Sequence, residues 1–176
     1  MISDGHQISE KLSFSQIECY IKNNELHKLG RSVHQRSEYH KAMDMVRLDF
    51  YSIYDYILIN KFHCNIEYCD CNRKVAVRGS IAMPIVCALN DFPYFFEDNV
   101  VHYILWKIGE EAIKYDEIQN AIHHLKLQYG ICKHKILGST FFMNPIELKS
   151  IPEINHMHIV LHLDYNSSSP KPSTCC

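Results

Sequence analysis

One segment near the C-terminal end constrains the fold more than any other part of the chain. From residue 155 to 163 the side chains alternate, with His156, His158 and His162 at even positions and Met, Ile or Leu at the intervening odd positions 157, 159, 161 and 163. Successive side chains of a β-strand point to opposite faces, so the pattern predicts a strand with one apolar face and one histidine face. We expect the apolar face to enter the core and the histidine row to face a cleft or solvent.

A row of imidazoles on one strand face is chemically suggestive. Neighbouring rings about 6–7 Å apart can contact one phosphate or one metal ion together. Because no carboxylate recurs at the same spacing, a phosphate is favoured over a metal. An exposed strand face that is rich in histidine by chance is the alternative.

The remaining periodicities predict an α+β protein. Ser13 and Gln16 form a capping box that begins a short helix, and apolar residues predict a second helix over about 35–61, kinked near Tyr51. A third amphipathic helix is expected over 110–129, with Gly130 as its C-cap. Strands are predicted at 74–78, 85–89, 100–107, 140–144 and 155–165. This order favours a mostly antiparallel sheet with helices on one side, preceded by a two-helix N-terminal lobe.

Length and composition fit a single domain. The 176 residues predict a flexible lead-in at 1–12, an α+β domain at 13–165 (a helical lobe at 13–62 and a sheet core at 74–165) and a disordered tail at 166–176. With 18 Lys and Arg against 20 Asp and Glu, the net charge of −2 argues against a nucleic-acid partner. The longest apolar run, 81–89, is too short to cross a membrane, so no transmembrane segment is expected. The polar N-terminus lacks the apolar core of a signal peptide, which predicts a cytoplasmic or nucleocytoplasmic location with cysteines as thiols.

Other polar residues sit at predicted strand ends, where ligands often bind. Asn144 ends a strand and Ser150 precedes the histidine strand, although ordinary turn chemistry explains both as well. Asn90, Tyr94, His102 and Trp106 belong to a hairpin-like unit whose aromatic rings can sandwich a planar base or a sugar. A hydrophobic corner of the core is the competing interpretation of that unit.

The cysteines offer two weaker signals. His63, Cys64, Cys69 and Cys71 have the ligand types of a zinc site. The three cysteines are not spaced as in a standard zinc finger, and the sequence places no fourth partner with them. No cofactor is therefore expected, with zinc as the less favoured alternative. Cys175 and Cys176 end the chain like the double-cysteine tail of prenylated small GTPases, without the P-loop of those proteins.

Three blocks together resemble a known family. They are 13–62, the stretch Leu-Asn-Asp-Phe-Pro-Tyr at 89–94 with His-Tyr-Ile-Leu-Trp at 102–106, and Leu-Lys-Ser-Ile-Pro-Glu-Ile at 148–154 with the histidine strand. This combination resembles the N-acetylglucosamine-induced protein family, built around a domain of unknown function, over about residues 13–163. The resemblance implies a link to an amino-sugar response and no known reaction.

The second half also resembles, more distantly, the histidine-triad (HIT) nucleotide-binding superfamily. The resemblance implies that Asn90 takes the place of a ribose-contacting acid, Asn144 that of a phosphate-side Asn, and His102 that of the return-strand histidine. It places His156 and His158 on the first two motif histidines, so these two are the candidates for any catalytic role. The third motif position, the nucleophile of that superfamily, is Val160 here, and His162 lies about 7 Å further along the strand.

The sequence therefore predicts a HIT-like domain that binds a nucleotide or sugar phosphate, without a covalent intermediate. The predicted ligand-binding residues are Asn90, Tyr94, His102, Trp106, Asn144, Ser150, His156, His158 and His162. A non-enzymatic regulatory or interaction protein, with a protein partner, is the main alternative, and a zinc-binding protein is a weaker one.

Overall fold

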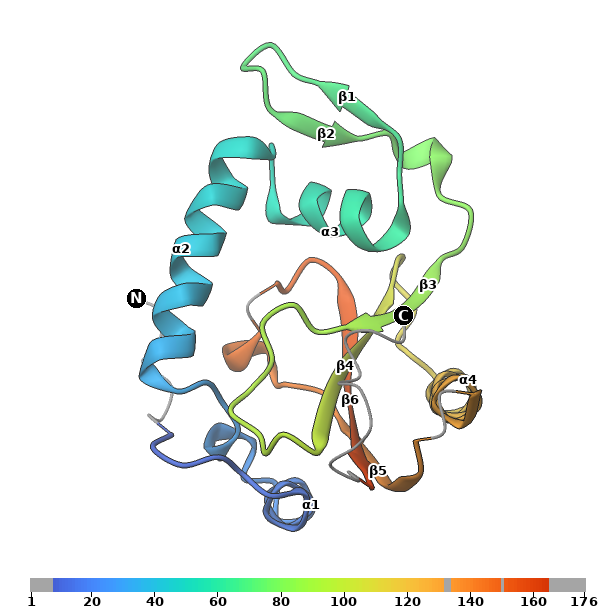
Figure 1. Ribbon diagram of the computed structural model, residues 1–176. Coiled ribbons are helices and arrows are strands. Elements are labelled where there is room, and N and C mark those ends of the chain that lie inside the picture. Colours follow the sequence, from blue (N-terminus) through green and yellow to red (C-terminus); the bar gives the residue numbers. More distant parts are fainter. Residues whose placement is uncertain (1–7, 132–133, 150, 165–176) are drawn as a thin grey trace.

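A four-stranded antiparallel sheet forms the centre of the molecule. The computed structural model describes residues 8–131, 134–149 and 151–164. The sheet order is β3-β4-β6-β5, with bounds Ile85–Leu89, Val100–Lys107, Asn155–Leu163 and Ile136–Phe142 (Figure 1). Every neighbouring pair is antiparallel, and β4 and β6 are paired along the length of β4. The predicted α+β class and mostly antiparallel sheet are confirmed.

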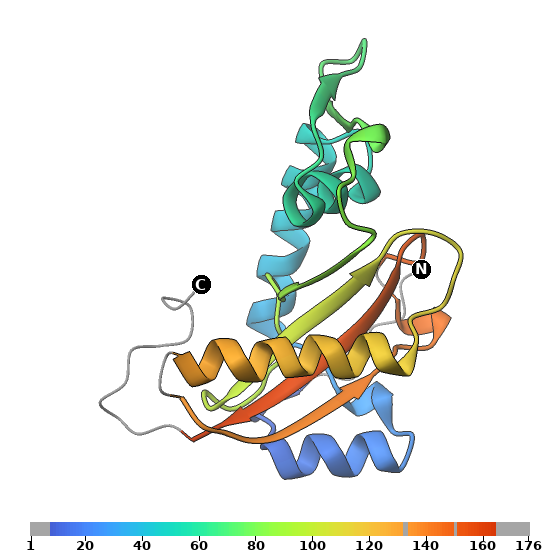
Figure 2. The same ribbon diagram turned by 90° about the vertical axis from the view of Figure 1, so that its right-hand side faces the viewer.

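One face of the sheet is covered by a single long helix. α4 (Tyr115–Ile131) lies across this face (Figure 2). The odd-numbered side chains of β4 and β6 meet it in the largest buried cluster, as the period-2 pattern predicts. Ile159, Leu161 and Leu163 are fully buried there.

The N-terminal lobe covers the opposite face. It contains α1 (Phe14–Lys22), α2 (Val33–Asp49), α3 (Ile53–Phe62) and a two-stranded ribbon of β1 (Ile66–Tyr68) and β2 (Lys74–Ala76), with short 3-10 turns at Leu26–Lys28 and Arg78–Ser80. A third such turn, Ile146–Leu148, lies between β5 and β6. In Figures 1 and 2 the helices of the lobe and α4 lie on opposite sides of the sheet. The sequence predicted a helix packed on one side of the sheet and left the position of the lobe open. The lobe supplies a second layer, which buries the histidine face.

The lobe has three helices where the sequence predicted two. The apolar stripe over 35–61 is interrupted by the extended residue Phe50, whose bridge to Lys74 joins the ribbon. Ser52 then caps α3 by accepting the N–H of Asp55. The Asp55 side chain is buried and accepts the backbone N–H of Ala76 at 3.1 Å, so a contact with β2 fixes the break.

Several boundaries match the prediction and others move. The capping box at Ser13, the strand 85–89 and the strand 100–107 are confirmed. The helix α4 begins five residues later than predicted and continues through Gly130. The segment 8–12, predicted to be flexible, packs through Ile8 and Leu12, whereas 1–7 and the predicted tail at 166–176 lie outside the described residues. Within the described ranges no helix combines the length and apolarity needed to cross a membrane.

Candidate functional site

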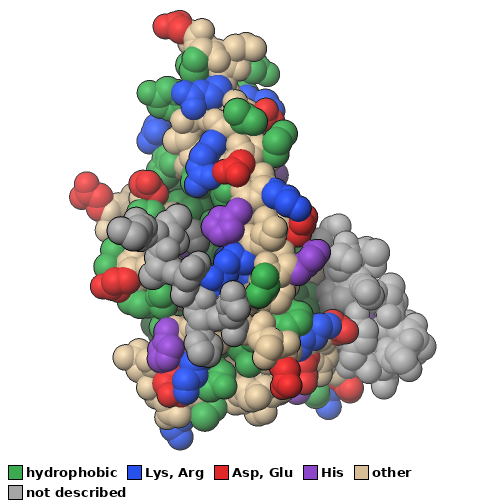
Figure 3. Space-filling view, turned by 90° about the vertical axis from the view of Figure 1, so that its left-hand side faces the viewer, with side chains coloured by type: hydrophobic (Ala, Val, Ile, Leu, Met, Phe, Trp, Pro, Cys, Tyr) green, Lys and Arg blue, Asp and Glu red, His purple; other side chains and the backbone are tan. Residues whose placement is uncertain are grey.

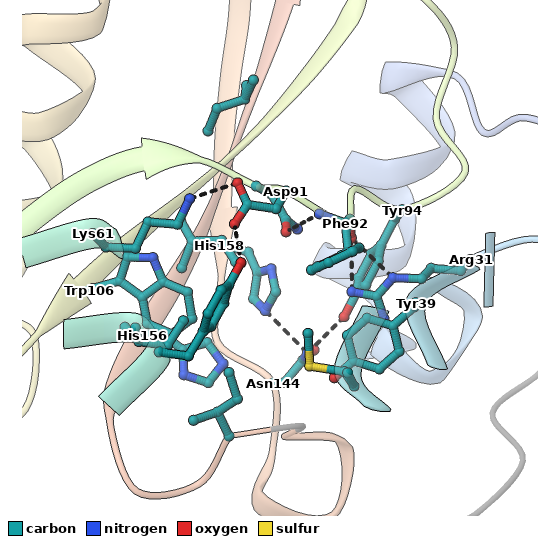
Figure 4. Close-up of a pocket in the computed structure, with 17 residues that line it drawn as sticks. Arg31, Tyr39, Lys61, Asp91, Phe92, Tyr94, Trp106, Asn144, His156 and His158 are labelled. Carbon is teal, nitrogen blue, oxygen red and sulfur yellow. Dashed lines mark hydrogen bonds and ion pairs between the residues drawn. The ribbon is translucent and has the colours of Figure 1, made fainter. Parts of the chain in front are cut away.

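A pocket lies where the helical lobe meets the histidine face of the sheet (Figure 4). Its enclosed free volume is about 60 Å³. The side chains come from six stretches of chain, namely α2 with the residue before its cap, α3, the loop after β3, β4, the end of β5, and β6. They include Arg31, Tyr39, Tyr56, Lys61, Asn90, Asp91, Tyr94, Trp106, Asn144, His156 and His158.

A buried hydrogen-bond chain forms the wall of the pocket. His102 Nε2 and His158 Nδ1 are 2.8 Å apart, and His158 Nε2 lies 3.2 Å from Asn144 Nδ2. The same Asn144 amide is 2.8 Å from the Tyr94 hydroxyl. All three side chains of the chain core (His102, His158 and Asn144) are at most 5% exposed. Phe142 stacks on His158 with a ring-centroid separation of 4.6 Å and an interplanar angle of 3°, which fixes the imidazole plane.

The hydrogen bonds at His102, one end of this hydrogen-bond chain, determine which nitrogen atoms carry protons. The backbone N–H of Tyr94 and the Asn90 amide both point at His102 Nδ1, each at 3.3 Å. The Asn90 amide cannot turn, because its Oδ1 accepts the Phe92 N–H at 3.0 Å. His102 Nδ1 is therefore an acceptor, and in a neutral imidazole the proton must then sit on Nε2.

The tautomer of His102 determines the tautomer of His158 and the amide orientation of Asn144. His102 Nε2–H donates to His158 Nδ1, so neutral His158 also carries its proton on Nε2. Two donors, His158 Nε2–H and the Asn144 NH₂ group, would then face each other. Turning the Asn144 amide by 180° resolves the conflict, because its oxygen then accepts from both His158 and the Tyr94 hydroxyl. We assign this orientation to Asn144.

Burial keeps the imidazoles of this chain neutral. Loss of solvent lowers the pKa of His102 to about 3, and the nearby Arg31 guanidinium adds to the shift. Burial likewise holds the pKa of His158 well below its usual range, assisted by repulsion from His102, His156 and Arg31. At neutral pH the histidines thus supply oriented hydrogen-bonding groups and no positive charge.

His156 and Trp106 present unused groups to the pocket. His156 Nδ1–H donates to the Ile154 carbonyl at 3.0 Å, which leaves a lone pair on Nε2. The pKa of His156 is lowered by burial. Trp106 packs on His156 at a ring-centroid distance of 5.1 Å, and its indole N–H is a buried donor with no acceptor among the described residues. A buried unpaired donor costs about 1–3 kcal/mol, which a ligand acceptor would recover.

The positive charge of the pocket comes from Arg31 and Lys61. Arg31 donates twice to the Phe92 carbonyl, at 3.0 and 2.8 Å, and its guanidinium lies 4.2 Å from the Tyr39 ring centroid. No described carboxylate pairs with Arg31, and burial lowers its pKa. Lys61 pairs with Asp91 at 2.7 Å, and Asp91 also accepts from the Tyr56 hydroxyl. Two cations and one carboxylate leave the described lining with a single excess positive charge.

The structure brings together most of the predicted ligand-binding residues. Six of the nine line the pocket, namely Asn90, Tyr94, Trp106, Asn144, His156 and His158, and His102 lies directly behind His158. Ser150 lies outside the described residues. Tyr94 was expected to stack on a ligand. In the structure its ring stacks on His158 and its hydroxyl bonds to Asn144, so it supports the wall of the pocket. Whether these residues bind a ligand stays a prediction.

Only two of the three histidines that were predicted to share one cleft do so, and His162 does not. His162 shares the strand face with His156 and His158, but its ring stacks on Phe14 of α1 at 5.0 Å and its Nε2 faces Asn99. Val160 lies between the two regions, is fully buried, and packs in the cluster of Phe14 and Phe142. α1 therefore divides the histidine face into two parts. His156 and His158 line the pocket, as the prediction of a cleft requires, whereas His162 packs against α1 outside it.

The zinc candidates do not assemble. Cys69 and Cys71 are adjacent at the tip of the β1–β2 ribbon, whereas His63 is exposed and Cys64 is buried. In the ranges that the structure covers, no group of three or more His, Cys, Asp or Glu side chains is arranged to hold a metal ion. Cys175 and Cys176 lie outside those ranges.

The sequence did not single out Arg31, Tyr39, Tyr56, Lys61 or Asp91. Arg31 precedes Ser32, whose capping box begins α2, and Asp91 follows Asn90 in the loop after β3. Their convergence depends on docking of the lobe against the sheet, which no local pattern reveals.

Comparisons with known proteins agree with the closer resemblance. The sequence profile of a protein family of unknown function (DUF3605) matches residues 13–162. The N-acetylglucosamine-induced protein 1 of Candida albicans is 26% identical over 177 residues, which cover 86% of this chain and 68% of that protein. The uncharacterized protein YPL067C of Saccharomyces cerevisiae is 27% identical over 171 residues, covering 92% and 84%. The crystal structure of HTC1 is similar in fold, with a TM-score of 0.55, 20% identity and coverage of 93% and 90%. The HIT-like resemblance stays a prediction.

Proposed function

Since the chain belongs to the DUF3605 family of proteins of unknown function, we propose a function from its pocket: it binds a phosphorylated small molecule, a sugar phosphate or a nucleotide, through the phosphate group. The observation that carries the proposal is a pair of groups on opposite sides of the pocket (Figure 4): the buried Trp106, whose N–H has no partner among the described residues, and the half-buried Arg31, which no described carboxylate neutralises. Both groups donate hydrogen bonds, and a guanidinium matches the oxygens of a phosphate in shape and charge.

The other pocket groups suit the same class of ligand. The Nε2 lone pair of His156 can accept a hydroxyl or a protonated phosphate oxygen. The single excess positive charge favours an anion, and the low-dielectric surroundings strengthen that attraction. Charges on the outer face do not suggest a polyanion, because basic and acidic side chains are interspersed on the face seen in Figure 3.

The size of the cavity limits what is enclosed. A pocket that encloses a drug-sized ligand measures about 300–1,000 Å³, and the enclosed volume here is about 60 Å³. We therefore place the phosphate inside and the sugar or nucleoside at the mouth, near Tyr39 and Tyr56.

The proposal is binding without nucleophilic catalysis. The place of the third motif histidine is held by Val160, which is 0% exposed and contacts core side chains. His158 Nε2 is engaged with Asn144, so neither of these two positions offers a free nucleophile. His156 keeps a free Nε2 lone pair, and the proposal gives it the role of a hydrogen-bond acceptor for the ligand.

A single tryptophan makes the proposal directly testable. The sequence has one Trp, so the protein shows one indole N–H resonance, and it reports on Trp106, which lines the pocket. The probes are inorganic phosphate, glucosamine 6-phosphate and AMP, with unphosphorylated glucosamine as the control ligand. Amino-sugar phosphates enter the panel because one relative is named as N-acetylglucosamine-induced.

We expect at least one phosphorylated probe to shift the indole resonance with saturation, and glucosamine to leave it in place. Arg31→Gln should weaken that binding about tenfold or more, because a charge-assisted bond contributes about 1.5–3 kcal/mol. Arg47→Gln, on an exposed part of α2, is the matched control and should bind as the wild type does. An indole resonance unmoved by millimolar concentrations of all three probes would refute the proposal.

A second candidate is a regulatory protein that acts through a protein partner. The observation in its favour is the group of exposed apolar side chains at the end of α2, where Met45, Leu48 and Tyr51 are 59%, 69% and 58% exposed. A stoichiometric partner that is captured by the wild type and by His156→Ala, and lost with Leu48→Glu, would support this function. A cytoplasmic or nucleocytoplasmic location stays part of the proposal.

A further inference from the structure

The tip of the β1–β2 ribbon holds two thiols in close contact. The Sγ atoms of Cys69 and Cys71 are 2.6 Å apart, about 0.5 Å longer than a disulfide bond. Cys71 is exposed and Cys69 is half-buried. The pair is remote from the pocket residues and has no part in the function proposed above.

The backbone of the turn holds the two thiols together. The Cys69 N–H donates to the Arg73 carbonyl at 3.0 Å, and the Asn72 N–H donates to the Cys69 carbonyl at 2.8 Å. Asn72 adopts the left-handed conformation, with φ of 58°, which asparagine tolerates better than most residues. The turn is therefore closed by its own hydrogen bonds, and bringing the sulfur atoms together costs little additional chain entropy.

Arg73 places a positive charge against one of the two sulfur atoms. Its Nε lies 3.2 Å from Cys71 Sγ, and the guanidinium rests over the Tyr51 ring at 5.3 Å. The contact with Cys69, followed by the contact with Arg73, lowers the pKa of Cys71 to about 7. A substantial fraction of Cys71 is therefore thiolate at neutral pH, the form that attacks disulfides.

From this arrangement we propose that Cys69 and Cys71 form a redox-active dithiol that a low-molecular-weight disulfide converts reversibly into an intramolecular disulfide. The Cys71 thiolate attacks one sulfur of oxidised glutathione, forming a mixed disulfide and releasing one glutathione thiolate. The Cys69 thiol then loses its proton and attacks Cys71 Sγ, which forms the Cys69–Cys71 bond and releases the second glutathione. The protein dithiol loses two electrons and two protons, and one oxidised glutathione becomes two reduced glutathiones.

Cys64 is the internal comparison within the same stretch of chain. Its thiol is buried and hydrogen-bonds to Ser80, and burial raises its pKa. It should therefore react slowly and stay reduced while the ribbon pair is oxidised.

Peptide mass analysis of the full chain tests the proposal. The reduced protein is incubated with oxidised glutathione, quenched with N-ethylmaleimide and digested with trypsin. Cleavage after Lys61 and Arg73 yields the peptide 62–73, which contains all three cysteines. We expect this peptide to lose two hydrogen atoms and to carry a single maleimide, on Cys64, and to carry three maleimides after treatment with excess reduced glutathione.

Serine variants separate the pair from the other thiol. Cys69→Ser and Cys71→Ser should each abolish the internal disulfide and leave a glutathione mixed disulfide on the remaining ribbon cysteine, formed about fivefold more slowly in Cys71→Ser. Cys64→Ser, the matched control, should still form the disulfide. The proposal is overturned if the peptide keeps three maleimides in excess oxidised glutathione, or if the bond that forms includes Cys64.

Discussion

Neutral histidines in the wall of the pocket predict that the protein loses stability on mild acidification. The unfolded chain protonates an ordinary imidazole with a pKa near 6.5, whereas burial lowers the pKa of folded His102 to about 3. Between these values the unfolded state binds more protons than the folded state, so the free energy of unfolding falls as the pH falls. Above pH 6.5 both states are neutral and the penalty vanishes.

The magnitude follows from the difference in proton binding. At pH 5 the unfolded state gains about 2 kcal/mol for each histidine that the fold keeps neutral, and at pH 7 only about 0.2 kcal/mol. The cost at pH 5 does not depend on the folded pKa once that pKa lies well below 5. His158, whose pKa is also lowered by burial, adds a similar amount, so the two together remove about 4 kcal/mol between pH 7 and pH 5. This is a large part of the ~5–15 kcal/mol that stabilises a typical domain.

Urea titrations at pH 7 and pH 5 measure the effect, with carboxylates still ionised in most positions at both values. The double variant His102→Gln/His158→Gln should be less stable than the wild type at pH 7 but should lose about 4 kcal/mol less on acidification. His34→Gln, which removes an exposed histidine of α2, should retain the wild-type pH dependence. If the double variant does not fold, imidazole resonances of the wild type give the same information, because those of His102 and His158 should not titrate between pH 7 and pH 5. Equal wild-type stability at both pH values, or titration of either ring near pH 6.5, would refute the assignment of neutral buried imidazoles.

Substitutions at Trp106, Val160 and Gly138 test other parts of the structure through urea midpoints. Trp106→Phe removes the unpaired buried N–H and should change the unfolding free energy by no more than about 1 kcal/mol, whereas Trp106→Ala should cost about 3–5 kcal/mol; equal losses would mean that the indole N–H has a partner. Val160→His should cost about 3 kcal/mol or more and confer no nucleotide hydrolysis, because the site is a filled core position; a stable or active variant would contradict this. Gly138→Ala places a Cβ 2.8 Å from Phe14 Cε1 and should cost about 1–3 kcal/mol, while Gly79→Ala, which meets nothing within 4 Å, should be nearly neutral. Similar values for the two alanine variants would argue against the packing of α1 on β5.

The sheet and the two faces of β6 could be predicted because their information is local. Each strand carries a period of two, and the odd positions 157–163 of β6 reach the α4 core as the pattern predicts. The sequence predicted a kink near Tyr51, but not that the helix would end there and a separate helix α3 begin. The apolar stripe continues through residues 50–52, and the interruption depends on the long-range bond from Asp55 to Ala76 in the ribbon.

Some residues of the site could be predicted because their signal in the sequence is also local. Polar residues on strands or at strand ends, such as Asn144 and His156, are visible in the sequence as departures from an apolar pattern. Arg31 and Lys61 enter the pocket through docking of the lobe, and their partners Phe92 and Asp91 lie 61 and 30 residues further along the chain, so no spacing rule connects them. His162 failed as a site residue because Phe14, far away in the chain, occupies its face.

The direction of the hydrogen-bond chain explains why an amide suits position 90. Asn90 and the backbone N–H of Tyr94 both donate to His102 Nδ1, so the proton of His102 sits on Nε2. His102 Nε2–H then donates to His158 Nδ1, and His158 Nε2–H donates to the Asn144 oxygen. An ionised acid at position 90, as the HIT pattern would have it, would instead accept a hydrogen bond from Nδ1–H and raise the pKa of His102. The Tyr94 N–H would then lose its acceptor, and a charged pair would be buried where the chain now keeps neutral rings. Asn90 and Val160, the two departures from the HIT pattern, thus have a common effect. Both keep charge and a nucleophile out of the wall, so the positive charge of the described lining comes from Arg31 and Lys61.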